Sequence, residues 1–395
     1  MSDPKKLLKE RDGYVESINL FLNSHKAGTI DELRVCFDLT QQHKRYIDRW
    51  IEIALMKKCE RLELDFEPCR LNHRRDSGNY RLGHNFSSSS ETRFLTGLCL
   101  KHVDVSGRIL ESFLSNCPLL ETLHVSHSKE LTHISFCGSS LRLKHLHVSF
   151  CKCVKSIVVY APNLVSFEYR GEEHIAVHID LKYVPQLYDL SYAGQWASRW
   201  VPALRKCIPS SLATSQLVNL SLQIPDLRGD ITPNHPHFSK LRCLTLEFPK
   251  LRLPIQFTAL LVDYCKLMTY MPLLDKFNVE LEAVEAHILT EVEEFQRIIL
   301  VGYRLSFELK LLGMEQPMML REVEIVGFVG ASSDTTLVYF LSLVAPNLES
   351  IVINRRLPRW YPVDERKIME LEDARMFAYD LLSTYRPKDA KFLLL

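Results

Sequence analysis

A short apolar string, Leu-x-x-Leu-x-Leu or a close variant of it, returns twelve times along this chain of 395 residues. The first positions of successive strings lie 29, 36, 25, 23, 21, 23, 30, 24, 33, 46 and 28 residues apart. A pattern that returns in order over a limited range of spacings indicates one structural unit repeated along the chain. The strings begin at Ile30, Cys59, Leu95, Leu120, Leu143, Leu164, Leu187, Leu217, Leu241, Leu274, Leu320 and Leu348.

Each string predicts a short strand. Alternate side chains of a strand lie on the same side, so the apolar residues of Leu-x-Leu point inward and the residue between them points outward. Repeats stacked about 4.8 Å apart bury these apolar rows against each other and pair into a parallel sheet. The central spacings lie within the roughly 20 to 29 residues of leucine-rich repeats. We therefore expect an α/β fold: a leucine-rich-repeat solenoid with a curved parallel sheet on the concave face, and helices and extended returns on the convex face. The expected interior includes Leu123, Leu146, Leu164, Leu190, Leu220, Leu244, Phe277, Ile325 and Ile351.

The segments between and beyond the strings predict the outer layer and the two ends. Residues 14–25 fit a helix that caps the first repeat, with Tyr14, Ile18, Phe21 and Leu22 on one face. Residues 67–93 have no apolar period and are expected to form a mobile loop. The expected organisation is an N-terminal helical cap (residues 1–29), irregular leucine-rich repeats (30–319), and terminal repeats with a C-terminal cap (320–395). A second helix is expected at residues 45–58, with Ile47, Trp50, Ile51, Ala54 and Leu55 on its apolar face.

Composition argues against several classes of protein. The chain has 49 Lys and Arg against 48 Asp and Glu, a formal charge of +1, which favours neither nucleic acid nor an anionic membrane as partner. No apolar run approaches the roughly 20 residues that span a bilayer, and the polar start does not resemble a signal peptide. We expect reduced cysteines, with Cys36, Cys99 and Cys243 as small fillers in the repeat strands. A cytoplasmic or nuclear location follows from these expectations.

Four stretches carry a resemblance to a known family. They are GTIDELRVCFDLTQQHKRYIDRWIEIALMKKCERLELDF from Gly28 to Phe66, LESFLSNCPLLETLHV through the fourth string, LRLKHLHVSFCKCVKSIVVYAPNLVSFEYRG through the next two, and LREVEIVGFVGASSDTTLVYFLSLVAPNLESIVIN near the C-terminus. In order and wording they resemble the leucine-rich portion of plant F-box/LRR proteins that carry a C-terminal FBD domain. The resemblance implies that residues 320–395 are FBD-like. It also implies a protein-interaction module, the substrate-recognition part of an SCF-type E3 ubiquitin ligase.

The F-box itself, which in that family holds the Skp adaptor, has no counterpart before Tyr14. Two functions therefore stay open. The chain recognises a protein for ubiquitination when an F-box upstream supplies the Skp adaptor, or it is a stand-alone interaction scaffold or decoy that recruits no ligase. We expect the 395-residue chain alone not to bind the adaptor.

The candidate partner-binding residues come from the outward positions of the strands and from one insertion. The outward positions of the regular central repeats give His124, His145, His147, Glu168 and Asp189. Such a face is the usual binding surface of a solenoid. The insertion before Leu217 adds Trp196, Arg199 and Trp200, residue types enriched at interface hot spots. The two tryptophans, four residues apart, also fit an apolar helix face that covers the solenoid.

Catalytic, metal and cofactor sites are not expected. The chain has no Gly-rich phosphate loop, no His-Glu-x-x-His and no Gly-x-Ser-x-Gly, and so we predict that it is not an enzyme and holds no cofactor. Neighbouring strands could bring His124 and His147 within about 5 Å, with Glu168 beside them. Zinc would need three or four ligands with supporting hydrogen bonds, so we interpret this group as part of a protein-binding face.

Overall fold

The structure is a computed structural model that describes residues 4–68, 78–87, 89–138, 141–172, 175, 177–194, 216–223, 238–248, 271–281, 319–328, 337–338, 341, 345, 347–354 and 390–395. The chain divides into two compact units. Unit 1 contains residues 1–187 and 206–213, and unit 2 contains residues 188–205 and 214–395.

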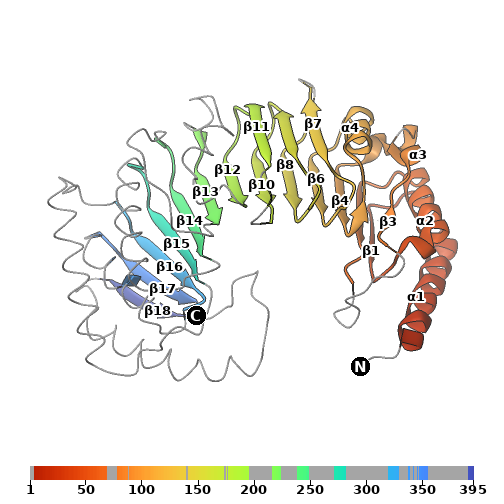
Figure 1. Ribbon diagram of the computed structural model, residues 1–395, viewed down its shortest axis with the longest axis horizontal. Helices are drawn as coiled ribbons and strands as arrows, with labels where there is room; N and C mark the ends of the chain where they lie inside the picture. Colours follow the sequence, from red (N-terminus) through yellow and green to blue (C-terminus); the bar gives the residue numbers. More distant parts are fainter. Residues whose placement is uncertain are drawn as a thin grey trace. The chain divides into compact units, whose positions relative to one another are not determined.

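Unit 1 is built on a parallel sheet whose strands are the first six strings (Figure 1). Neighbouring strands pair residue for residue without a shift, so each interior residue stacks on its equivalent in the next repeat. Along every strand the second and fourth residues are buried, as the alternation predicts. The strands are β1 (Glu32–Cys36), β2 (Arg61–Asp65), β4 (Gly97–Lys101), β6 (Thr122–Ser126), β8 (His145–Ser149) and β10 (Ser166–Arg170).

The returns between these strands form the outer layer of unit 1. Helix α2 (Lys44–Met56), which follows the short η1 (Gln41–His43), buries the five apolar residues predicted for it. Helix α4 (Gly107–Asn116) lies against β7 (His133–Cys137). Strand β7 pairs with β9 (Ser156–Tyr160) and β9 with β11 (His178–Tyr183), so extended returns stack into a second parallel sheet. The predicted mixture of helices and extended returns is confirmed. None of the helices in the described residues is both long and apolar enough to cross a membrane.

The N-terminal helix α1 (Pro4–Ser24) packs on α2, as expected of a cap, but one residue of its predicted face is wrong. Tyr14 stacks on Phe37 with ring centroids 4.4 Å apart, and Leu22 is buried. Phe21 is 61% exposed, whereas Val15 is buried. Trp50 Nε1 of α2 donates to Asn19 Oδ1 at 2.8 Å, and Val15 lies four residues before Asn19 on the same side of the helix, so the contact face runs through position 15 instead of position 21.

The prediction of a loop over residues 67–93 is wrong for its second half. Residues 78–94 contain β3 (Tyr80–Arg81), α3 (His84–Ser87) and η2 (Ser90–Phe94), and β3 pairs with β5 (Val103–Asp104). Tyr80 and Phe86 anchor this segment, because both rings are almost completely buried and the Tyr80 hydroxyl donates to Asp48 Oδ1 at 2.7 Å. Two isolated aromatic anchors give no apolar period, which is why the pattern misses them. Residues 69–77 and 88 lie outside the described residues.

Unit 2 continues the same construction with the remaining strings. Its parallel strands again pair in register, and the predicted interior residues of both units are at most 4% exposed. One strand, β18, carries no string and was not expected. The predicted cap residues Trp360, Tyr361 and 366–385 lie outside the described residues. The strands are β12 (Asp189–Ala193), β13 (Asn219–Gln223), β14 (Cys243–Phe248), β15 (Lys276–Leu281), β16 (Glu322–Val326), β17 (Ser350–Asn354) and β18 (Lys391–Leu394).

The expected role of three cysteines is also wrong. Cys36, Cys99 and Cys243 occupy first, third or fifth positions of their strands, which point away from the interior, and Cys36 is exposed. The buried thiols that fill the interior instead belong to Cys59, Cys117 and Cys151, which lie in turns next to the strands. All the cysteines in the described part of the chain are free thiols.

Candidate functional site

The outward positions of the six sheet strands of unit 1 form a surface that we call the polar face. Because the strands pair in register, these side chains stand in three columns that cross the strands. The first column is Glu32, Arg61, Gly97, Thr122, His145 and Ser166; the middle column is Arg34, Glu63, Cys99, His124, His147 and Glu168; the last column is Cys36, Asp65, Lys101, Ser126, Ser149 and Arg170.

Ion pairs link the strands at the β1 end of the polar face. Arg34 Nε lies 3.0 Å from Glu63 Oε2, and Lys101 Nζ lies 3.3 Å from Glu63 Oε1 and 3.2 Å from Asp65 Oδ2. The ammonium group of Lys101 thus joins β4 to two carboxylates of β2. Opposite charges across neighbouring strands stabilise the pairing modestly, since the groups are partly exposed.

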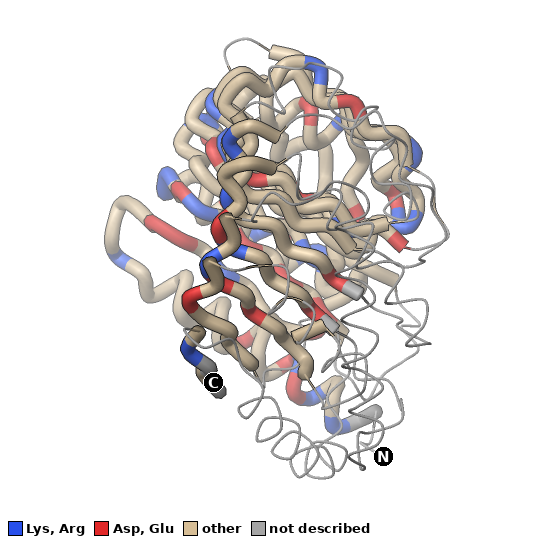
Figure 2. Tube along the Cα trace, turned by 90° about the vertical axis from the view of Figure 1, so that its left-hand side faces the viewer, with Lys and Arg blue, Asp and Glu red and all other residues tan. Residues whose placement is uncertain are grey.

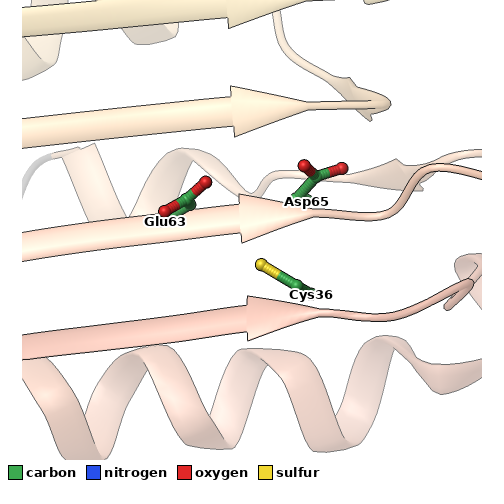
Figure 3. A group of neighbouring side chains, drawn as sticks. All are labelled: Cys36, Glu63 and Asp65. Carbon is green, nitrogen blue, oxygen red and sulfur yellow. The ribbon is translucent and has the colours of Figure 1, made fainter.

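Cys36, Glu63 and Asp65 meet closely enough to suggest a metal site. Their possible ligand atoms all lie within 4.8 Å of one another, and Figure 3 shows the three side chains on the adjacent strands β1 and β2. Two cations already serve this group, because Lys101 contacts both carboxylates, and Arg34 Nε, which pairs with Glu63, also donates to Cys36 Sγ at 3.3 Å. A metal ion would have to displace both, so we interpret the group as an ion-pair cluster.

Histidines occupy the centre of the polar face. The rings of His124 and His147 lie with centroids 4.0 Å apart and planes at 39°. His147 Nδ1 lies 2.9 Å from Glu168 Oε2, and its Nε2 lies 2.9 Å from the Ser149 hydroxyl. A carboxylate only accepts, so Nδ1 carries a proton, and in the neutral ring Nε2 accepts from Ser149. Both ring nitrogens of His147 are therefore engaged, which fixes its orientation.

The surroundings of these groups shift their protonation. Burial, together with the neighbouring His147 and Lys101, lowers the pKa of His124 to about 4. Burial would raise the pKa of Glu168, but its hydrogen bonds to His147 and Arg170 and their positive charges outweigh burial and lower it to about 2. At neutral pH Glu168 is thus a carboxylate and His124 a neutral imidazole.

Ser149, His147 and Glu168 are linked by hydrogen bonds in the same order as the serine, histidine and acid of hydrolases. This group nevertheless lacks two features that such catalysis needs: an accessible serine hydroxyl and an oxyanion hole. Ser149 is only 3% exposed, so its hydroxyl does not reach a substrate carbonyl. Strand β8 pairs with both β6 and β10, and the backbone N–H groups beside Ser149 are used in the sheet instead of forming an oxyanion hole. The arrangement orients His147, and a leucine-rich repeat is typically a non-catalytic scaffold.

The structure brings together only some of the residues that were predicted to bind a partner. His147 contacts both His124 and Glu168, so these three lie side by side as predicted, and His145 is exposed in the first column between Thr122 and Ser166. Asp189 belongs to unit 2, where it accepts a hydrogen bond from Asn219 Nδ2. Trp196, Arg199 and Trp200 lie outside the described residues.

The last column of the polar face was missed. Lys101, Ser149 and Arg170 determine the charge and orientation of the central histidines, but the predicted columns stop one outward position earlier. Extending each predicted strand by one residue past its Leu-x-Leu would have found them, because the strands run that far before they end.

The outward positions of unit 2 also carry hydrogen bonds and ion pairs between neighbouring strands. Asn278 Nδ2 donates to Thr245 Oγ1 at 3.2 Å, and Lys276 Nζ lies 2.7 Å from Glu322 Oε1. Further along the sheet the middle position becomes apolar, as Val352 is 8% exposed. Figure 2 shows acidic and basic positions interspersed along the described chain, without one block of a single sign.

Comparisons with known proteins agree with this architecture. A family model described as At1g61320/AtMIF1, LRR domain, matches residues 21–374. The chain is also 27% identical over 139 residues to a putative F-box/FBD/LRR-repeat protein, At5g22670, of Arabidopsis thaliana; the match covers 31% of this chain and 31% of that relative. The family match spans nearly all the repeat strands of both units. The chain therefore belongs to the family of the At1g61320/AtMIF1 leucine-rich-repeat domain.

Proposed function

We propose that this chain is the recognition part of an F-box/LRR-type ubiquitin ligase subunit and that it holds its partner protein on the polar face of unit 1, at His124, His145, His147 and Glu168. The leucine-rich-repeat domain makes it a protein-interaction module. The observation that carries the proposed site is the fixed orientation of His147 between Glu168 and Ser149 on an in-register sheet. Side chains that are already ordered lose little conformational entropy when a partner binds.

The ligase role is supported by the similarity to the putative F-box/FBD/LRR-repeat protein of Arabidopsis thaliana, which covers about a third of each chain. A cytoplasmic or nuclear location belongs to this proposal. The binding role of Asp189, Trp196, Arg199 and Trp200 stays a prediction, as does the division into a cap (1–29), repeats (30–319) and FBD-like terminal repeats (320–395).

Site-specific crosslinking tests the proposed surface. A photo-crosslinking amino acid replaces His145 on the polar face or, as a matched control, His178, which is also an exposed strand histidine but lies on the second sheet. We expect one partner protein to crosslink at position 145 and not at position 178. A partner that crosslinks equally at both positions, or only at 178, would place the binding surface elsewhere.

The ligase role has its own test. The partner captured at position 145 should gain ubiquitin chains when the chain is fused to an F-box that binds the Skp adaptor. A partner that is captured but not modified in the fusion favours the scaffold or decoy function. Polar-face binding would stand in that case, and the ligase role would not.

A further inference from the structure

Three neighbouring strands of unit 1 are each followed by a residue with left-handed backbone geometry. His102, His127 and Phe150 have φ angles of 56°, 55° and 52°, and they directly follow the last residues of β4, β6 and β8. This region favours glycine, and a bulky residue such as phenylalanine rarely adopts it. A strained geometry that returns at the same position of three successive repeats points to a use for the side chains that it places there.

The rings of these residues form one stack, which we call the aromatic stack. The rings of His102 and His127 lie with centroids 4.1 Å apart and planes at 16°. Those of His127 and Phe150 lie with centroids 5.0 Å apart and planes at 31°. The backbone N–H of each residue donates to the carbonyl that ends the next strand, so the stack follows the spacing of the sheet.

The aromatic stack is closed at one end and open at the other. Phe66, which follows β2, is completely buried, whereas Phe150 is 38% exposed. In the register of β8 and β10 the position after Phe150 is Gly171, which adds no ring. A Cβ at Gly171 would overlap the hydroxyl of Tyr169, so a side chain does not fit at this position. Phe150 therefore presents ring surface that the chain itself leaves uncovered.

Carboxylates lie beside the open end of the stack. Glu172, two residues after β10, pairs with Lys152 through Oε1 at 2.9 Å, and its Oε2 accepts from no group in the described part of the chain. Glu67 is exposed and forms no ion pair with a described residue. Burial lowers the pKa of His127, an effect that Lys152 reinforces and the negative charges of Glu67, Asp65 and Glu172 oppose. Since Asp65 and Glu172 already have cationic partners, Glu67 is the carboxylate of this group that is left without one.

We propose that Phe150 binds an arginine side chain of a partner protein, whose guanidinium group stacks on the ring and donates to Glu172. The end of a ring stack favours a planar group, and the neighbouring carboxylates favour a positive charge. A guanidinium group is planar and always charged, stacks on aromatic faces and donates to carboxylates, whereas an ammonium group lacks the plane. This inference goes beyond the proposed function, because it uses none of the four polar-face residues named there.

Fluorine NMR with small arginine probes tests this inference. 4-Fluorophenylalanine replaces Phe150 in the folded 395-residue chain, which is titrated with the N-acetyl amides of arginine, citrulline and lysine. Citrulline keeps the plane without the charge, and lysine keeps the charge without the plane. We expect the arginine probe to shift the fluorine resonance saturably, and the other two to bind roughly threefold to fivefold more weakly. Equal binding of citrulline or lysine, or a resonance that arginine does not move, would overturn the inference.

Two variants of the labelled chain locate the contact. Glu172→Gln should weaken binding of the arginine probe severalfold, because it removes the carboxylate that accepts from the guanidinium group. The matched control is Glu121→Gln, since Glu121 pairs with Lys144 at 2.8 Å at the opposite end of the strands. The two glutamates are 37% and 41% exposed, so neither change should unfold the chain. An unchanged affinity in Glu172→Gln, or an equal loss in Glu121→Gln, would refute the proposed contact.

The outcome separates this inference from the proposed function. If position 145 crosslinks a partner but the fluorine resonance does not respond to arginine, the polar-face proposal stands and the arginine site falls. If the resonance responds but no partner crosslinks at position 145, the arginine site stands and the polar-face proposal falls.

Discussion

The polar face of unit 1 and the outward side of the unit 2 sheet have the same backbone construction and different chemistry. In both sheets, each strand contributes one residue to each outward column, and neighbouring strands pair in register. In unit 1 the middle column holds charged residues and two histidines, which are linked by ion pairs as short as 2.9 Å. In unit 2 the same column begins with Ser191, Ser221 and Thr245 and ends with Val352 and Leu393.

This difference shows which residues specify the scaffold and which specify recognition. The apolar positions are interchangeable between the units, since leucine, valine, isoleucine and phenylalanine all occupy them and all are buried. The outward positions have no such constraint and vary from repeat to repeat. Under the proposed function, recognition is encoded in the residues that the repeat pattern leaves unspecified.

The largest expected effect tests the shared scaffold. Leu146→Asp in unit 1 and Leu220→Asp in unit 2 should each lower the free energy of unfolding by more than the about 2–5 kcal/mol typical of a buried Leu→Ala change, because an unpaired charge is also buried. Both leucines are 1% exposed. Urea denaturation measures the loss, with His145→Asp as the exposed control. A tolerated Leu220→Asp would show that the register of unit 2 is wrong.

Partner capture tests the difference between the two faces. His147→Ala/Glu168→Ala should weaken capture of the crosslinked partner by roughly tenfold, since it removes two members of the ordered cluster. The matched change in unit 2 is Ser221→Ala/Thr245→Ala, which should have no effect. If changes between Arg321 and Asn354 abolish capture instead, the recognition surface is the FBD-like end.

The loss of folding stability at acid pH should reveal the contributions of His124 and Glu168. Burial lowers the pKa of His124 from 6.5 to about 4, so the unfolded chain takes up this proton first and the folded state loses stability as the pH falls between these values. Glu168, with a pKa lowered from 4.5 to about 2, adds a further loss at lower pH. Urea midpoints for the wild type should fall between pH 6.5 and 4 more steeply than for His124→Gln. An unchanged slope in that variant, with His178→Gln as control, would contradict the assignment.

The scaffold could be predicted from the sequence because it depends on periodicity alone. All twelve strings form strands, and the apolar face of α2 falls where the pattern puts it. Strand β18 was not predicted, because no leucine precedes Lys391–Leu394 at the spacing of the repeat string. The β3–α3 segment was not predicted, because single buried residues such as Tyr80 are held by contacts with distant parts of the chain, and these contacts produce no periodic pattern in the sequence.

For the site, the sequence predicts which residues are neighbours but not how their side chains interact. Counting along the strands is enough to place His124, His147 and Glu168 side by side, since strand pairing in register follows from stacked repeats. Which ring nitrogen meets Glu168, and that Ser149 meets the other, depends on side-chain rotation about a fixed backbone. The role of Lys101 required knowing that its ammonium group reaches across to β2.

The smallest expected effect compares a lysine in each sheet. Lys101 is 29% exposed and serves Glu63 and Asp65, whereas Lys276 is 36% exposed and serves Glu322 at 2.7 Å and Glu324 at 3.8 Å. Lys276→Met should cost at most about 1 kcal/mol, as exposed ion pairs do. Lys101→Met should cost more, because the side chains of its partners Glu63 and Asp65 are only 16% and 17% exposed, against 42% and 24% for Glu322 and Glu324. Screening by salt should reduce both losses. Urea denaturation at low and high salt measures both losses. A larger loss for Lys276→Met would show that the ion pairs of the polar face do not stabilise the sheet of unit 1 more than those of unit 2 stabilise its sheet.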